Sequence, residues 1–502
     1  MTFDVHQLDS FLLVGALVTL AAILAVRASA VAGLPSLLIY LFIGVLLGEA
    51  GPIGIQFEDA QLAHALGFAA LAVILAEGGL TTDWRQVRPS MPLGISLATV
   101  GVAVSTALVA VPAHYVLGLP WELSVLLGAV CSPTDAAAVF SMLRLGALPR
   151  RLTGVLEAES GLNDAPTVVV VTFISTGVVA EQGLLAVSAL VVYELVAGIA
   201  IGFVIGVIGG WVLRRVALPS SGLYPLAVLC LAFLAYGVGA AAHTSGFAAI
   251  FVAGLVLGNS DLPHRVATRS FAEGVAWLAQ IGLFVMLGLL LSPGRITGTT
   301  VLYAVVTGLV LTCVARPVSV VVSSIAQRMG RRDLAFISWA GLRGAVPIVL
   351  MTIPLAEGVS GADRLFDIVF VMVVIYTLLT GPTLSYVARL LGVAERHAPR
   401  GLEVEAAPLE RVDADLLQVT ITQTSRMHGV EVAELRLPRG ASVSLVIRSG
   451  EVLVPERRTV LRHGDDLVVV TPRRLREATE KRLRQVSASG RLAQWLGEGE
   501  RP

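Results

Sequence analysis

Long apolar segments are the feature that most limits what this chain can fold into. Thirteen stretches in its first 391 residues each approach the roughly 20 apolar residues that a helix needs to cross a bilayer. A mean hydropathy of +0.81 with only 14% charged residues fits a membrane protein and not a string of soluble domains. The sequence therefore predicts a polytopic all-α membrane protein. The expected spans are 8–27, 34–49, 62–80, 91–115, 121–143, 153–176, 184–212, 223–242, 246–258, 274–292, 299–325, 334–355 and 365–391.

Charge divides the chain into two unlike parts. Residues 1–390 hold 18 Arg and no Lys, whereas the last 112 residues hold another 18 basic side chains. The total is balanced, 36 basic against 36 acidic residues, which argues against a nucleic-acid binder. We therefore predict four segments. They are a membrane domain (1–391), a linker (392–412), a small α+β cytoplasmic domain (413–473) and a basic C-terminal helix or tail (474–502).

The arginines also indicate how the spans are oriented. If the N-terminus lies outside, the cytoplasmic loops hold thirteen arginines and the outer loops hold only Arg295 and Arg364. Such an excess is typical of cytoplasmic loops. We expect a multi-pass protein of the cell inner membrane with its C-terminal domain in the cytoplasm. The first span lacks a basic flank and a cleavage signal, so we interpret it as a retained span.

Two spans carry a proline beside a charged residue. In the fifth span Pro133 precedes Asp135 by two residues, and in the twelfth Pro347 follows Arg343 by four. A proline cannot donate a backbone hydrogen bond, so helical carbonyls near it lose their partners. The two spans are seven apart, as expected if spans 1–6 and 8–13 are inverted repeats. A pair of interrupted spans at matching places predicts the ion site of a secondary transporter.

The sixth span adds oxygen-bearing side chains. At helical spacing Ser160 and Asp164 lie one turn apart on one face, and Glu159 and Asn163 lie on the neighbouring face. Oxygen-only ligands suit a hard cation. Because a buried Glu159 would be costly alone, we expect it to pair with a buried arginine, and both Arg343 and Arg316 are candidates.

Three motifs in register resemble a known family. The runs Ser132-Pro133-Thr134-Asp135, Glu159-Ser160-Gly161-Leu162-Asn163-Asp164 and Gly341-Leu342-Arg343-Gly344-Ala345-Val346-Pro347 are similar to those of monovalent cation:proton antiporters of the electroneutral Na⁺/H⁺ exchanger branch. The resemblance implies a secondary transporter and not an enzyme. It further implies a homodimer in the lipid bilayer, with broken crossing helices and an elevator-type alternating access, that carries monovalent cations and protons without a cofactor.

The resemblance also assigns roles to individual residues. It makes Asp164 the carboxylate that binds either the cation or a proton. Asn163 stands where electrogenic relatives have a second Asp, which implies a one-for-one exchange. The cation cage would be completed by Asp135, Ser160 and Thr134, and the broken helices would be held by Glu159, Asn163 and Arg343, with Arg316 as the other candidate partner of Glu159.

The C-terminal part changes to short alternating segments that predict strands near 419–422, 442–447 and 466–470. These residues resemble the RCK-C (TrkA-C) regulatory domain of potassium transport systems. No G-x-G-x-x-G follows a strand here, so the dinucleotide-binding half of such regulators is not expected. The sequence names no ligand for the tail; a cytosolic nucleotide is one candidate effector. Residues 473–496 are expected to form a basic amphipathic helix.

The tail shifts the expected cation toward K⁺, because antiporters of this branch with such a domain resemble NhaP-type K⁺/H⁺ antiporters. An Na⁺(Li⁺)/H⁺ antiporter fits the same ligands and remains an alternative. A potassium channel would need a filter such as Thr-Val-Gly-Tyr-Gly, and an intramembrane aspartyl protease a Gly-x-Gly-Asp run; neither occurs. Three scattered cysteines in apolar runs indicate neither a disulfide framework nor a metal site.

Overall fold

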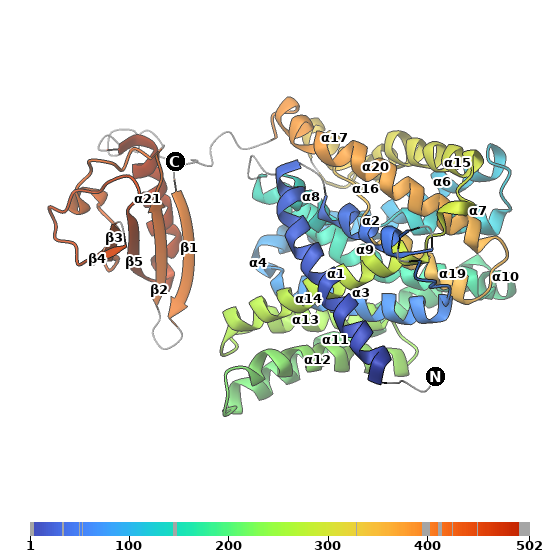
Figure 1. Ribbon diagram of the computed structural model, residues 1–502, viewed down its shortest axis with the longest axis horizontal. Coiled ribbons are helices and arrows are strands. Elements are labelled where there is room, and N and C mark those ends of the chain that lie inside the picture. Colours follow the sequence, from blue (N-terminus) through green and yellow to red (C-terminus); the bar gives the residue numbers. More distant parts are fainter. Residues whose placement is uncertain are drawn as a thin grey trace. The chain divides into compact units, whose positions relative to one another are not determined.

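The computed structural model divides into two compact units, residues 1–395 and 396–502, called here the membrane unit and the tail unit (Figure 1). Each is described by itself. The described residues are 5–32, 35–49, 51–52, 54–143, 148–327, 329–393, 402–409, 414–423, 425–448 and 450–490.

The membrane unit is helical over its described length. Each of the thirteen predicted spans coincides with one helix or with a run of consecutive helices. Within the described residues, seven helical segments are long and apolar enough to cross a membrane, and further apolar helices are shorter. The helices are α1 (Val5–Ala32), α2 (Ser36–Leu47), α3 (Ala60–Thr81), α4 (Trp84–Val87), α5 (Met91–Ser96), α6 (Val102–Tyr115), α7 (Trp121–Cys131), α8 (Ala136–Met142), α9 (Arg150–Ser175), α10 (Val178–Gln182), α11 (Leu184–Arg215), α12 (Leu223–Ala241), α13 (Gly246–Gly258), α14 (Arg265–Leu290), α15 (Gly298–Val310), α16 (Arg316–Ser323), α17 (Arg331–Trp339), α18 (Val346–Leu350), α19 (Thr352–Ala356) and α20 (Ala362–Leu390).

These helices pack as two bundles. One contains α2, α3 and α11 to α14, and the other contains α5 to α9 and α15 to α20. Figure 1 shows α11, α12 and α13 together on one side of the unit and α15, α17 and α20 together on the other. Helices α3 and α9 contact members of the opposite bundle, so they lie where the bundles meet.

The interrupted spans lie where the prolines predict them. Helix α7 ends at Cys131 and α8 begins at Ala136, while α17 ends at Trp339 and α18 begins at Val346. The polytopic helical fold with two broken helices is thus confirmed.

A second pair of irregular spans was not predicted. The fourth span contains a π-helical turn at Leu97–Gly101, and the eleventh contains one at Leu311–Ala315. These two spans are again seven apart, as are the broken spans. Each turn packs against the helix that follows the other, namely α16 and α6. Two matched pairs of irregular helices are what inverted repeats produce, since a local distortion is then copied into both halves.

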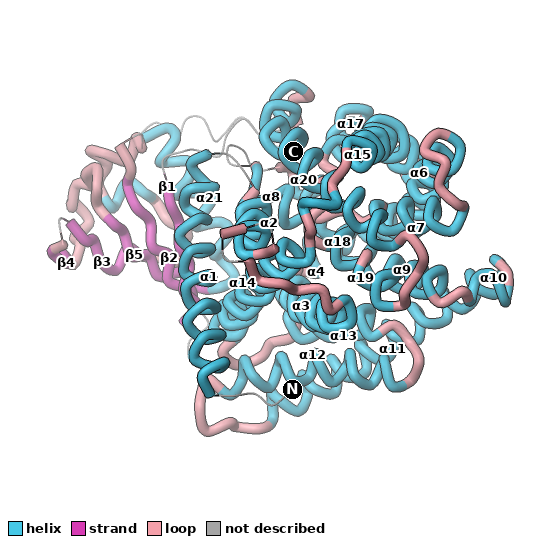
Figure 2. Tube along the Cα trace, turned by 45° about the vertical axis from the view of Figure 1, so that its right-hand side comes forward, coloured by secondary structure: helices cyan, strands magenta, loops and turns pink. Residues whose placement is uncertain are grey.

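The tail unit is a five-stranded antiparallel sheet with a helix against it. Its elements are β1 (Leu402–Leu409), β2 (Ala414–Ile421), β3 (Ser442–Arg448), β4 (Glu451–Leu453), β5 (Asp466–Pro472) and α21 (Arg476–Ser489). The strand order is β1-β2-β5-β3-β4, which can be followed across the sheet in Figure 2. Leu483 and Val486 of α21 pack into one apolar core with Leu417, Val419 and Val469. Helix α21 lies within the predicted basic helix, of which residues 491–496 fall outside the described part.

Strand β1 lies in residues that we expected to be a linker. Its Pro, Glu and Ala content is typical of a linker, but Leu402 and Val404 alternate with Glu403 and Glu405 as a strand requires. Pro408 is compatible with pairing because β1 is an edge strand that bonds only to β2.

An ion pair with a buried carboxylate joins Arg448, at the end of β3, to Asp465, which immediately precedes β5. Asp465 is fully buried and accepts hydrogen bonds from Arg448 Nε and Nη2, each at 2.8 Å, and from the Arg462 backbone N–H at 2.8 Å. Burial opposes ionisation of Asp465, but the bonds from Arg448 and Arg462 outweigh it and hold the pKa of this carboxyl below its ordinary value.

This pair predicts a pH-dependent stability for the isolated tail unit. The pKa of Asp465 is lower in the folded state than in the unfolded chain, so its contribution is present above the ordinary Asp pKa and is lost as pH falls through the folded value. Asp465→Asn should lower the free energy of unfolding by about 3 kcal/mol at pH 7, because it leaves Arg448 without its charged partner. Urea unfolding at pH 7 and at progressively lower pH checks this. The difference between variant and wild type should shrink below about pH 4; an equal difference at all pH values would contradict it.

Candidate ion-binding site

The two helix breaks lie against each other. The backbone N–H of Asp135 donates to the carbonyl of Leu342 at 2.8 Å, joining the α7/α8 break to the α17/α18 break. Arg343 Nε donates to the carbonyl of Cys131 at 3.1 Å, and its Nη1 donates to the carbonyl of Gly341. Carbonyls at helix ends lack intrahelical partners and carry partial negative charge. One buried guanidinium therefore satisfies carbonyls at the C-terminal ends of both α7 and α17.

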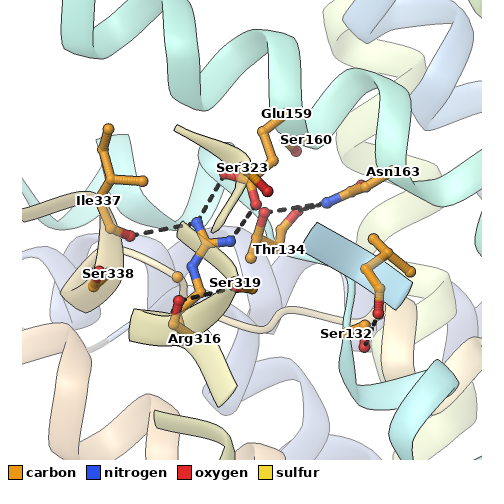
Figure 3. Close-up of polar contacts among 12 residues, drawn as sticks. Ser132, Thr134, Glu159, Ser160, Asn163, Arg316, Ser319, Ser323, Ile337 and Ser338 are labelled. Atoms are coloured by element: carbon orange, nitrogen blue, oxygen red, sulfur yellow. Dashed lines mark hydrogen bonds and ion pairs between the residues drawn. The ribbon is translucent and has the colours of Figure 1, made fainter. Parts of the chain in front are cut away.

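Helix α9 is tied to the first break through polar side chains. Asn163 Nδ2 donates to the backbone carbonyl of Thr134 at 3.3 Å and to its hydroxyl at 3.1 Å, as Figure 3 shows. One turn away, Ser160 Oγ accepts from the backbone N–H of Ala136 at 3.2 Å. Backbone groups freed by the break are thus satisfied from α9, which a lipid environment demands.

Asp164 lies on α9 one turn beyond Ser160 and is 6% exposed. Among the described residues its Oδ1 atom has no hydrogen-bond partner. Asp135 is half-buried, caps α8 by accepting from the Ala138 N–H at 3.1 Å, and is close enough for its charge to act on Asp164. A buried acceptor without a donor is expensive unless a proton or a cation binds there. The arrangement suits a site that alternates between those two ligands.

Glu159 forms a buried ion pair with Arg316, and each side chain is 3% exposed. Arg316 Nη2 donates to Glu159 Oε2 at 2.8 Å and to the carbonyl of Ile337 at 3.3 Å, and Nη1 donates to Glu159 Oε1 (Figure 3). Of the two candidate arginines, the partner is thus Arg316, because Arg343 is engaged by carbonyls. The pair joins α9, α16 and α17 next to the two helix breaks.

Comparison with known proteins identifies the family. The family model for the transmembrane sodium/hydrogen exchanger matches residues 15–390, and the TrkA-C domain matches residues 416–484. The chain belongs to the sodium/hydrogen exchanger family. It is therefore a membrane antiporter and not an enzyme.

Individual relatives match this chain over most of its length. The chain is 33% identical to the K⁺/H⁺ antiporter NhaP2 of Shewanella oneidensis, over 99% of this chain and 87% of that protein. It is 34% identical to the K⁺/H⁺ antiporter NhaP of Alkalimonas amylolytica, over 90% of this chain and 79% of the relative. The sodium proton antiporter MjNhaP1 of Methanocaldococcus jannaschii has a similar fold, with a TM-score of 0.64 at 20% identity, covering 77% of this chain and 99% of that one.

The eight predicted site residues lie at the contact between the two helix breaks and on the adjoining helices α9 and α16. Sequence reasoning missed Gly344 and Thr377. A side chain at Gly344 would overlap the carboxylate of Asp135, and Thr377 Oγ1 donates to the carbonyl of Arg343 at 3.1 Å. Gly344 lies within a motif that was noted, but only the crossing geometry reveals why a glycine stands there.

An apolar cavity of about 570 Å³ lies beside α9, between it and helices α11 and α13. Its lining includes Trp84, the first residue of α4, and Asn259, which directly follows α13. Ala165, next to Asp164, also lines the cavity. The cavity therefore extends to the level of the candidate site.

We predict that Gly344→Ala abolishes transport without unfolding the protein. The three atoms nearest to the new methyl group all belong to the Asp135 side chain, namely Oδ2, Cγ at 2.9 Å and Cβ at 3.2 Å, and none is a backbone atom. The fold should therefore survive while the Asp135 carboxylate is forced from its place. Gly237→Ala in α12 is the matched control, since a methyl group there meets no atom within 4 Å. Cation-dependent proton movement in vesicles and thermal stability of the purified proteins should be compared. Full activity of Gly344→Ala would contradict the assigned packing.

Proposed function

We propose that this antiporter exports K⁺ from the cytoplasm in exchange for external H⁺, one for one, by an elevator-type movement of the site across the membrane. The observation that carries the proposal is the buried Asp164 carboxyl, with one oxygen lacking a donor, beside two broken helices. Asp135, whose charge acts on Asp164, and Ser160 and Thr134, which bond at the same helix break, are proposed as further oxygen ligands. The K⁺/H⁺ antiporters named above support the choice of reaction.

We infer a one-for-one stoichiometry from the single charge that Asp164 can exchange. Asn163 brings an amide, which donates to Thr134, where a second carboxylate would add another negative charge. Asp164 can then be neutralised once, by one proton or by one monovalent cation. A bare carboxylate costs several kcal/mol to bury, so movement with the site empty is disfavoured. This energetic block is what couples cation movement to proton movement.

Sidedness is proposed from the arginines. The end of α9 that begins at Arg150 and Arg151, and the end of α11 that finishes at Arg214 and Arg215, carry positive charge expected in the cytoplasm. In this orientation the N-terminus lies outside, the tail unit lies in the cytoplasm, and the membrane is the cell inner membrane. A homodimer is proposed from the family resemblance.

K⁺ is preferred over Na⁺ in this proposal because of the named relatives and the TrkA-C domain. Na⁺/H⁺ antiport is the alternative, since another relative is the Na⁺/H⁺ antiporter ApNhaP of Aphanothece halophytica, 24% identical over 76% of this chain. Hard oxygen ligands accept both cations.

Asp164→Asn should abolish exchange, because an amide can neither release a proton nor neutralise a cation. The measurement is the collapse of a respiration-generated pH gradient in everted vesicles on adding K⁺, Na⁺ or Li⁺ separately, with and without a clamped membrane potential. Asp261→Asn, in an exposed loop, is the control and should behave as wild type. Exchange that persists in Asp164→Asn would reject the carrier assignment, and a rate that depends on the clamped potential would reject the one-for-one stoichiometry.

Removal of the tail unit, residues 396–502, should leave exchange intact but change how its rate depends on pH or on a cytosolic ligand such as a nucleotide. The cut is placed at 396 because β1 belongs to the sheet and would otherwise lose its partner strand. Rates of full-length and truncated protein should be compared between pH 6 and 9 with and without added nucleotides. Identical profiles would exclude a regulatory tail.

A further inference from the structure

Glu157 is the one charged side chain among the described residues that line the apolar cavity beside α9. The rest of the wall is apolar or uncharged, with Trp84, Phe203 and Phe251 among the larger side chains. A carboxylate facing such a cavity is costly, so its presence calls for a reason.

No cationic partner explains Glu157. Among the described residues it forms neither an ion pair nor a hydrogen bond, and the charged group that acts on it is another acid, Asp83. The contrast with Glu159, two residues further along the same helix, is direct, because Glu159 is paired with Arg316. Helix α9 thus carries one carboxylate that holds the fold together and one that does not.

The position of Glu157 relative to Asp164 is set by the helix. Seven residues separate them, which is a rise of about 10 Å with a rotation of only about 20° from the same face. Gly161, which lies between the two acids in the sequence, and Ala165, which follows Asp164, also line the cavity. Glu157 is therefore the acid on the cavity wall, about two turns from Asp164 toward the end of α9 that begins at Arg150.

We propose that Glu157 forms a second binding station, at which a monovalent cation from the cytoplasm is captured before it reaches Asp164. This inference rests on the proposed antiport and adds a site to it. A single negative charge between apolar walls concentrates its field in the cavity and raises the local cation concentration and association rate, by about 10-fold or more in known cases. Because no arginine or lysine among the described residues pairs with Glu157, its charge can attract the transported cation.

The test measures the KM for K⁺ added to the cytoplasmic face of everted vesicles holding the full-length protein. Glu157→Gln keeps the shape and removes the charge, so KM should rise at least about fivefold while kcat stays within about twofold. Glu157→Asp keeps the charge and should restore most of the affinity. Glu122→Gln, at an exposed position at the start of α7, is the matched control and should leave both constants unchanged.

Salt dependence gives a second readout that a purely structural role would not move. Adding the chloride of the impermeant cation N-methylglucamine should raise KM for wild type and Glu157→Asp, and less for Glu157→Gln, because screening matters only where the charge remains. If Glu157→Gln accumulates poorly, the salt dependence of the wild-type KM still decides. The proposed binding station is rejected if KM is unchanged in Glu157→Gln or if only kcat falls. It is also rejected if the wild-type KM does not depend on salt. Absence of cation-dependent exchange by wild type would instead reject the proposed function itself.

Discussion

The structure depends on one constraint, that no backbone polar group inside a bilayer can be left without a partner. Breaking two spans frees carbonyls and N–H groups within the membrane-spanning part, where lipid offers them no hydrogen bond. The chain solves this by crossing the breaks, so that Asp135 donates to Leu342 and Arg343 donates to Cys131. These contacts between the two breaks are thus the condition under which broken helices can exist here, and they hold Asp135 near Asp164.

Burial also costs charged side chains, and the charged residues near the breaks are of two kinds, those with a partner and those without one. Arg316 and Glu159 neutralise each other, and Arg343 donates to the carbonyls of Cys131 and Gly341, so these three are bound to other protein groups. Asp164 is buried without such a partner. Removing one member of a buried pair usually costs about 3–5 kcal/mol, which makes the paired residues architectural. Asp164, which lacks such a partner, is therefore the acid at the breaks that we propose changes its charge during a cycle.

Much of this could be predicted from the sequence because membranes impose simple rules. Span length, arginine position and the prolines at 133 and 347 gave the helices, their order and the two breaks. The choice between Arg316 and Arg343 could not be made, since both are buried and only the crossing decides which guanidinium meets Glu159. The π-helical turns were missed because they share no common proline or glycine pattern, since Gly101 ends the first turn and Pro317 lies two residues beyond the second. Strand β1 was missed because composition outweighed a short alternation.

The two π-helical turns, Leu97–Gly101 and Leu311–Ala315, show that the proposed repeats share local irregularities as well as topology. A π-helical turn leaves backbone groups imperfectly bonded, which is tolerated where another element covers them. Here each turn is covered by the helix that follows its counterpart, and Ser96 and Ser323 exchange hydrogen bonds across that contact, Oγ to carbonyl at 3.0 and 3.3 Å. A defect in one repeat is therefore stabilised by the same defect in the other. If the site moves as a unit, these reciprocal bonds can travel with it unbroken, so that the cost of movement falls on the apolar surface beside α9 and not on the polar crossing.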